Sequence, residues 1–183
     1  MHEKVASSVV QEILRQLSSI ACLEGPSAEL AREVIYHGSA DIVFDDPDYG
    51  KHSPDASFGH SRAQYPGVII EISYLQKRKD LSHLADDYIL GSDGNIHAVV
   101  GLDVDYKGNL GSLSVWRPVI KRGYDGVPTL QAEKTVANQV SSVMKFALHT
   151  LTSVRYFATK TANQTSTQKP GYFFSLGIFV LKR

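Results

Sequence analysis

The stretch SPDASFGHSRAQYPGVIIEISYLQKRK, residues 53–79, places two carboxylates at unusual positions. Asp55 follows a proline at the head of one short apolar run, and Glu71 lies inside a second apolar run, Val68–Ile72. An unpaired ionised carboxylate in such surroundings would be costly. Glu71 is therefore expected to be a protonated carboxyl, a member of a salt bridge or a metal ligand.

The two acids can meet if their strands are neighbours. Residues 65–67, Tyr-Pro-Gly, turn the chain between them, and strands joined by such a loop can point both acids into one pocket. Paired carboxylates repel unless a cation lies between them, and Mg²⁺ is the abundant ion that prefers oxygen ligands. Side-chain alternation along a strand puts Ser73 on the same face as Glu71.

Hydrophobic periodicity and turn residues indicate the element order α-β-β-β-α-β-β up to Pro118. A helix is expected over residues 3–20, with a short second helical turn opened by Pro26 and Ser27. The expected strands cover residues 33–44, 55–58, 67–73, 96–106 and 110–120, with a helix over residues 79–90. We expect the second strand to run antiparallel to the first, and the third to be covered on both faces.

The final third of the chain has weaker patterns. Apolar residues at roughly helical spacing predict a helix over residues 131–150, although Thr, Ser and Val are weak helix formers. Residues 159–171 are polar and are expected to form an exposed loop, and residues 172–181 a closing strand. We expect a core over residues 1–120 and a basic C-terminal extension, residues 121–183, packed on the same domain.

The formal net charge is zero, but the two parts of the chain differ strongly. Residues 1–116 hold nine Lys/Arg and 17 Asp/Glu, whereas residues 117–183 hold ten Lys/Arg and two Asp/Glu. The basic part would either contact an anionic partner or neutralise the acidic part within the molecule. A single cysteine and the lack of a membrane-length apolar run predict an intracellular protein, nuclear or cytoplasmic, without a membrane partner.

Three segments, GSADIVF, SPDASFGH and YPGVIIEISYLQKRKDLSHLADDYI, carry a family resemblance. A Pro-Asp opening one strand, followed by an acid inside an apolar strand, resembles the PD-(D/E)XK (restriction-endonuclease-like) nuclease superfamily. More narrowly, the chain is similar to uncharacterised fungal proteins predicted to carry that fold. The resemblance covers about residues 3–118. It implies an α/β fold with a mixed central β-sheet flanked by helices.

The resemblance also implies roles for individual residues. Asp55 and Glu71 match the metal-binding acids, and Ser73 stands where the superfamily most often has a lysine. Serine cannot replace the charge of that lysine at the phosphate. The residues that would compensate are Gln76, Lys77 and Lys79. An acid of the first helix, Glu3 in preference to Glu12, would complete the metal ligands.

The implied activity is hydrolysis of phosphodiester bonds, in DNA or in RNA, by a Mg²⁺ (or Mn²⁺)-dependent nuclease. The alternative is a catalytically inactive relative that binds nucleic acid or protein. A third interpretation is a fragment of a larger protein whose other domains define its task. Taken alone, an aspartate after a proline, such as Asp55, is more often a turn residue than a ligand, and Glu71 could pair with Arg78 or Lys79. Asp41 would either support the site or belong to a hairpin.

Overall fold

A computed structural model describes residues 2–74, 80–104, 110–142, 154–157 and 175–178. The helices of this part are α1 (His2–Ala21), α2 (Pro26–Glu33) and α3 (Leu81–Gly91). The strands are β1 (Val34–Gly38), β2 (Ile42–Val43), β3 (Lys51–His52), β4 (Ala56–His60), β5 (Val68–Tyr74), β6 (Ala98–Val104), β7 (Leu110–Arg122), β8 (Pro128–Ser142), β9 (Val154–Phe157) and β10 (Ser175–Ile178).

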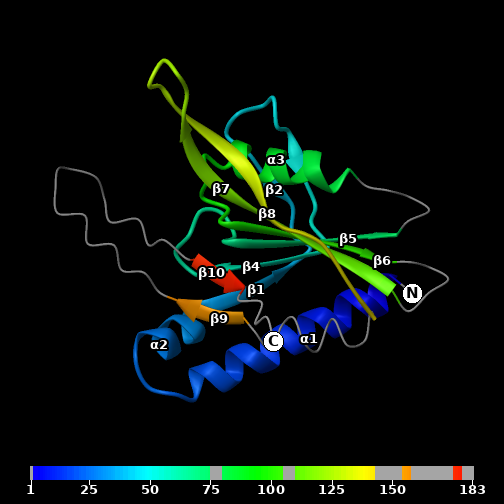
Figure 1. Ribbon diagram of the computed structural model, residues 1–183. Helices are drawn as coiled ribbons and strands as arrows, with labels where there is room; N and C mark the ends of the chain where they lie inside the picture. The colour runs from blue at the N-terminus through cyan, green and yellow to red at the C-terminus, as the bar shows by residue number, and fades with distance from the viewer. Residues whose placement is uncertain (1, 75–79, 105–109, 143–153, 158–174, 179–183) are drawn as a thin grey trace.

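Six strands form one mixed sheet in the order β1-β4-β5-β6-β7-β8. Only β5 and β6 are parallel within it, and α3 is the crossover between them; the other neighbours are antiparallel. Figure 1 shows α1 and α2 on one side of this sheet and α3 on the other. The described part is therefore an α/β fold, as the sequence predicts.

The sheet carries a hydrophobic core on each face. The core beneath α1 joins Val9, Val10 and Leu17 to strand residues such as Ile70, Ile72 and Leu113. The core beneath α3 joins Ala85, Tyr88 and Ile89 to Ile69, Val99 and Trp116. Because side chains alternate along β5, Glu71 shares its face with Ile69 and points toward α3. The expectation that this strand is covered on both faces is confirmed.

The first half of the chain follows the expected order with one difference. The helix expected over residues 3–20 is α1, and β4 runs antiparallel to β1 as predicted. The single strand expected over residues 33–44 is wrong, because it is divided into β1 and β2. Gly38 has a φ of +67°, a left-handed conformation that ends β1 and turns the chain away. The short β2 then pairs with β3 in a separate hairpin.

The helix expected over residues 131–150 is also wrong where the structure describes it. Those residues belong to β8 as far as Ser142, which pairs with β7 from Leu110↔Ser142 to Arg122↔Pro128. Gly126, with a φ of +75°, turns the chain between the two strands. One of the two edge strands of the main sheet, β8, thus comes from the region assigned to the C-terminal extension.

Two further predictions for the final third have different outcomes. The closing strand expected over residues 172–181 includes β10, Ser175–Ile178, which pairs with β9. The loop expected over residues 159–171 and the stretch 143–150 lie outside the described residues. No helix in the described ranges combines the length and apolarity needed to span a membrane.

Candidate active site

Asp55 and Glu71 face each other across β4 and β5. The register of these strands pairs Ala56 with Ile70 and Ser57 with Ile69, so one further step brings Asp55 opposite Glu71. Directly opposite residues of an antiparallel pair project to the same face, with Cβ atoms about 4.5–5.5 Å apart. The two acids predicted to meet therefore lie on one face of the sheet, the face covered by α3.

Asp55 is held at the end of the β4–β5 ladder by its own side chain. The backbone N–H of Ile72 donates a hydrogen bond to Asp55 Oδ2, 2.7 Å away. Pro54 before it is fully buried, which fixes the entry of the chain into β4. Asp55 is thus both a half-buried acid of the site and a part of the sheet's hydrogen bonding.

Glu71 is almost completely buried and accepts a hydrogen bond from a tyrosine of α3. Glu71 is only 2% exposed. The Tyr88 hydroxyl donates a hydrogen bond to Glu71 Oε1, 2.8 Å away. Burial, followed by the charges of Glu71 and Asp55, raises the pKa of Tyr88 far above its usual range. Tyr88 therefore remains a hydrogen-bond donor at all physiological pH values.

Tyr88 was not among the residues predicted for the site. Its position on the apolar face of the helix predicted burial but not the bond to Glu71. A signal was present, because a tyrosine placed in a core usually needs a polar partner for its hydroxyl. The sequence alone does not say which of the nearby polar groups that partner is.

Ser73 and Asp103 extend the polar row next to Glu71. Ser73 is 2% exposed and lies two positions from Glu71 on β5, hence on the same face. The parallel register pairs Ser73 with Asp103 on β6, and Asp103 in turn pairs with Ser112 on β7. Asp103 was missed, although an acid inside the apolar strand VVGLDV repeats the pattern that identified Glu71.

A histidine and a second acid lie beside Tyr88. The rings of His52 and Tyr88 are 5.3 Å apart between centroids, and His52 Nε2 lies 3.2 Å from Asp87 Oδ2. The two groups form no hydrogen bond, so the contact is an ion pair when His52 is protonated. Phe44 packs against the same two rings, at 6.0 Å from His52 and 6.3 Å from Tyr88. The β2–β3 hairpin thus forms one wall around the tyrosine.

Asp41 belongs to that hairpin. Its carboxylate accepts hydrogen bonds from Lys51 Nζ at 2.9 Å and from the Ser53 hydroxyl at 2.5 Å. These two donors lower the pKa of Asp41, the Ser53 hydroxyl more than the Lys51 ammonium. Of the two roles considered for Asp41, the contacts support the hairpin role. Its partner Ser53 lies two residues before Asp55 in the chain.

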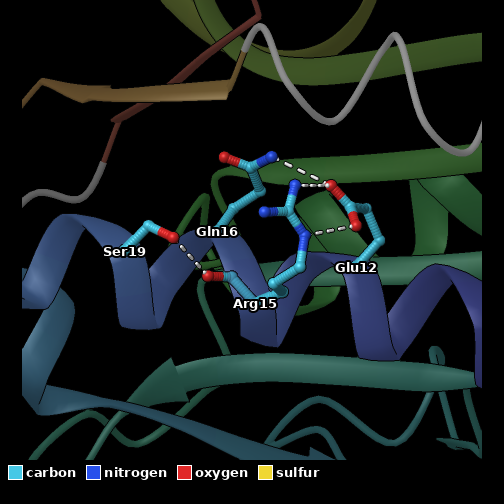
Figure 2. A network of polar contacts seen from close by, with 4 residues as sticks. All are labelled: Glu12, Arg15, Gln16 and Ser19. Atoms are coloured by element: carbon cyan, nitrogen blue, oxygen red, sulfur yellow. Dashed lines mark hydrogen bonds and ion pairs between the residues drawn. The ribbon is translucent and has the colours of Figure 1, made fainter.

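The acids of the first helix lie apart from the pair. Glu12 accepts hydrogen bonds from Arg15, at 2.6 and 2.8 Å, and from Gln16, at 2.9 Å (Figure 2). These hydrogen bonds lower the pKa of Glu12 to about 2, and those from Arg15 have a larger effect than the one from Gln16. One turn further along α1, the Ser19 hydroxyl donates a hydrogen bond to the backbone carbonyl of Arg15. Glu12 is therefore engaged within α1.

Glu3 is exposed in the first turn of α1. Since α1 covers the face opposite to Glu71, Glu3 could approach the acid pair only around the end of the sheet. Its role as a third ligand stays a prediction. The three residues proposed to replace the missing lysine, Gln76, Lys77 and Lys79, lie outside the described residues.

The residues present fit a hard divalent cation better than a thiol- or imidazole-binding metal. Asp55 and Glu71 offer carboxylate oxygens on one face of the sheet. Within the described ranges, no three His, Cys, Asp or Glu side chains come together as a metal-binding group. Mg²⁺ is commonly held by one or two carboxylates and completed by water and substrate phosphate, which agrees with this donor set.

Comparisons with protein-family models, with curated proteins and with solved structures find no match to this chain. Its function must therefore be argued from the geometry of the acid pair and from the resemblance of its sequence segments.

Proposed function

We propose that this chain is a metal-dependent nuclease that hydrolyses phosphodiester bonds of DNA, or of RNA, with Mg²⁺ or Mn²⁺ as its cofactor. The observation that carries this function is the register of β4 and β5, which sets Asp55 opposite Glu71 on one face. Two carboxylates in such a position can hold a divalent cation that also binds a substrate phosphate.

The order of elements supports the same function. Apart from the short α2 and the β2–β3 hairpin, the elements follow in the order α1, β1, β4, β5, α3 and β6: a helix, three antiparallel strands, a crossover helix and a parallel strand. This order is the one expected for a restriction-endonuclease-like core. The small β2–β3 hairpin, which lies between β1 and β4, would be an insertion into such a core.

The proposed mechanism assigns separate tasks to the residues. A bound Mg²⁺ would supply Lewis-acid chemistry at the phosphate and an activated water. Asp55 and Glu71 would hold the ion, and α3 would exclude water from the buried side of Glu71. A cation from Lys77 or Lys79 would stabilise the negative charge that develops on the phosphate. Gln76 would orient a water without adding charge.

A second candidate function follows from Ser73. This serine is buried at the position where the superfamily most often has lysine, so the charge has to come from elsewhere in the chain. If no lysine reaches the site, the fold would serve to bind nucleic acid or protein without cleaving it. This module would keep the acid pair as a structural feature.

Nuclease assays with matched variants test the proposal. Wild type, Asp55→Asn and Glu71→Gln are incubated with plasmid DNA, single-stranded DNA and RNA in Mg²⁺ or Mn²⁺. Glu12→Gln is the control, because it removes an acid engaged within α1. We expect cleavage by the wild type and the control, and a loss of at least about 100-fold in both site variants.

Two results would contradict the nuclease function. Equal cleavage by wild type and Glu71→Gln would assign the activity to a contaminant. Nucleic-acid binding without cleavage, unchanged by Mg²⁺ or Mn²⁺, would instead favour the non-catalytic module.

A further inference from the structure

We infer that Tyr88 is a positioning residue that fixes Glu71 as a one-oxygen ligand and thereby makes the site select Mg²⁺ or Mn²⁺ over Ca²⁺. This role rests on the proposed nuclease function, since it concerns the same acid pair. It adds a residue from α3, which the sequence resemblance does not imply, and a physical reason for discrimination against Ca²⁺.

The geometry of the Tyr88–Glu71 bond carries the inference. The hydroxyl donates to Oε1 at 2.8 Å, and both residues are buried, Tyr88 completely. Water cannot compete for a bond in such a place, so the bond directs the carboxylate strongly. Opposite a carboxylate oxygen the tyrosine hydroxyl can only donate, because an ionised carboxylate has no proton to offer. Glu71 Oε1 therefore faces a fixed donor.

The tyrosine itself is held in place from two directions. The backbone of α3 fixes its Cα, and the rings of Phe44 and His52 pack against its ring. His52 is in turn beside Asp87, one residue before Tyr88 on α3. A ring that is anchored on α3 and packed against the hairpin is restricted in its movement, and this restriction also limits rotation of the Glu71 carboxylate. The direction of the carboxylate is thus set by the packing of the hairpin on α3.

The consequence for metal binding follows from the way each ion uses carboxylates. Ca²⁺ takes six to eight oxygens in flexible geometry and often uses both oxygens of one carboxylate, whereas Mg²⁺ requires a compact octahedron. With Oε1 bonded to Tyr88, Glu71 would ligate an ion through one oxygen. Loss of the hydroxyl would let Glu71 turn and bind as a bidentate ligand, which favours Ca²⁺.

Calorimetric titration of the full chain with MnCl₂ and with CaCl₂ tests this role. Tyr88→Phe removes only the hydroxyl, and Tyr65→Phe is the matched control, a buried tyrosine whose ring packs on Phe44 in the same core. We expect Tyr88→Phe to lower the Mn²⁺ affinity about ten-fold and to shift the Mn²⁺/Ca²⁺ affinity ratio toward Ca²⁺. Tyr65→Phe is expected to leave the ratio unchanged.

The Glu71→Gln background shows whether Tyr88 acts through Glu71. Adding Tyr88→Phe to Glu71→Gln should cause no further loss of Mn²⁺ binding, because the group that Tyr88 directs is already gone. If Tyr88→Phe does not fold, Glu71→Asp replaces it. The shorter carboxylate keeps its charge but retreats from the hydroxyl, so the same shift of the affinity ratio is expected.

The possible failures are distinct. A wild type that binds neither ion overturns the proposed metal site, and this role with it. A wild type that binds Mn²⁺, loses it on Glu71→Gln, and keeps its affinity ratio in Tyr88→Phe overturns the positioning role alone. A loss of thermal stability in Tyr88→Phe without a change in the ratio also overturns it, because that result describes a purely structural tyrosine.

Discussion

The backbone N–H of Ile72 donates a hydrogen bond to the carboxylate of Asp55, 2.7 Å from Oδ2. Ile72 lies on β5 just beyond the last paired residues of β4 and β5. The side chain of Asp55 therefore takes the place of the backbone carbonyl that would continue the ladder. One oxygen of a proposed metal ligand is thus part of the sheet, and the two roles of Asp55 can be separated by mutation.

Substitution of Asp55 should separate stability from metal binding. Asp55→Asn keeps an oxygen that can accept from the Ile72 N–H, so the free energy of unfolding should stay within about 1 kcal/mol of wild type. Asp55→Ala leaves that buried N–H without its acceptor and should cost about 1–3 kcal/mol. Both variants should lose Mn²⁺ binding. Urea denaturation and calorimetry measure the two effects, and Mn²⁺ binding by Asp55→Asn would contradict the role of Asp55 as a ligand.

The meeting of Asp55 and Glu71 could be predicted because it depends on local features. The turn at residues 65–67 makes β4 and β5 neighbours, and strand alternation then determines the faces. The bond from Tyr88 depends on how α3 lies over the sheet, which no local pattern specifies. Residues 131–150 show a case in which the local pattern predicted the wrong element. Their apolar spacing resembled a helix, but pairing with the long β7 determined the outcome.

Gly101 should tolerate no side chain, because it stands beside the acid pair under a tryptophan. Gly101 pairs with Glu71 on the neighbouring strand. A Cβ atom there would lie 2.9 Å from Trp116 Cζ3 and 3.0 Å from Leu81 Cδ1. Gly101→Ala should therefore cost about 1–3 kcal/mol of unfolding free energy, measured by urea denaturation. In a Trp116→Phe background, with its smaller ring, the cost should fall by at least half. Equal costs in both backgrounds would show that Trp116 is not the obstacle.

The network around Glu12 should contribute to stability down to low pH. Arg15 and Gln16 lower the pKa of Glu12 from 4.5 to about 2. A group whose pKa is lowered on folding stabilises the folded state above its unfolded pKa, and this contribution is lost as the pH falls through the folded value. The difference in Tm between wild type and Glu12→Gln should thus be constant above about pH 5 and narrow between pH 4.5 and 2. Arg15→Gln should show the same profile, whereas a difference independent of pH would contradict the network.

The acid pair should reduce the stability of the metal-free protein. Glu71→Gln keeps an oxygen that can accept from the Tyr88 hydroxyl but replaces one of the two carboxyl groups on this face of the sheet by a neutral amide. We expect the metal-free variant to be more stable by about 1 kcal/mol, a rise in Tm of about 2–4 °C for a chain of this size. Functional sites commonly reduce the stability of the folded state in this way.

Addition of Mn²⁺ should make the wild type more stable than Glu71→Gln, because an ion that binds only the folded state stabilises it by mass action. Wild type should gain Tm with increasing Mn²⁺ and overtake Glu71→Gln, whose Tm should not respond. Differential scanning calorimetry of both proteins, with and without the ion, measures the crossing. A metal-free Glu71→Gln protein that is less stable than wild type would mean that a cationic side chain already neutralises the pair. In that case the carboxylates would form a structural ion pair, and a divalent ion would have to displace that cation before it could bind.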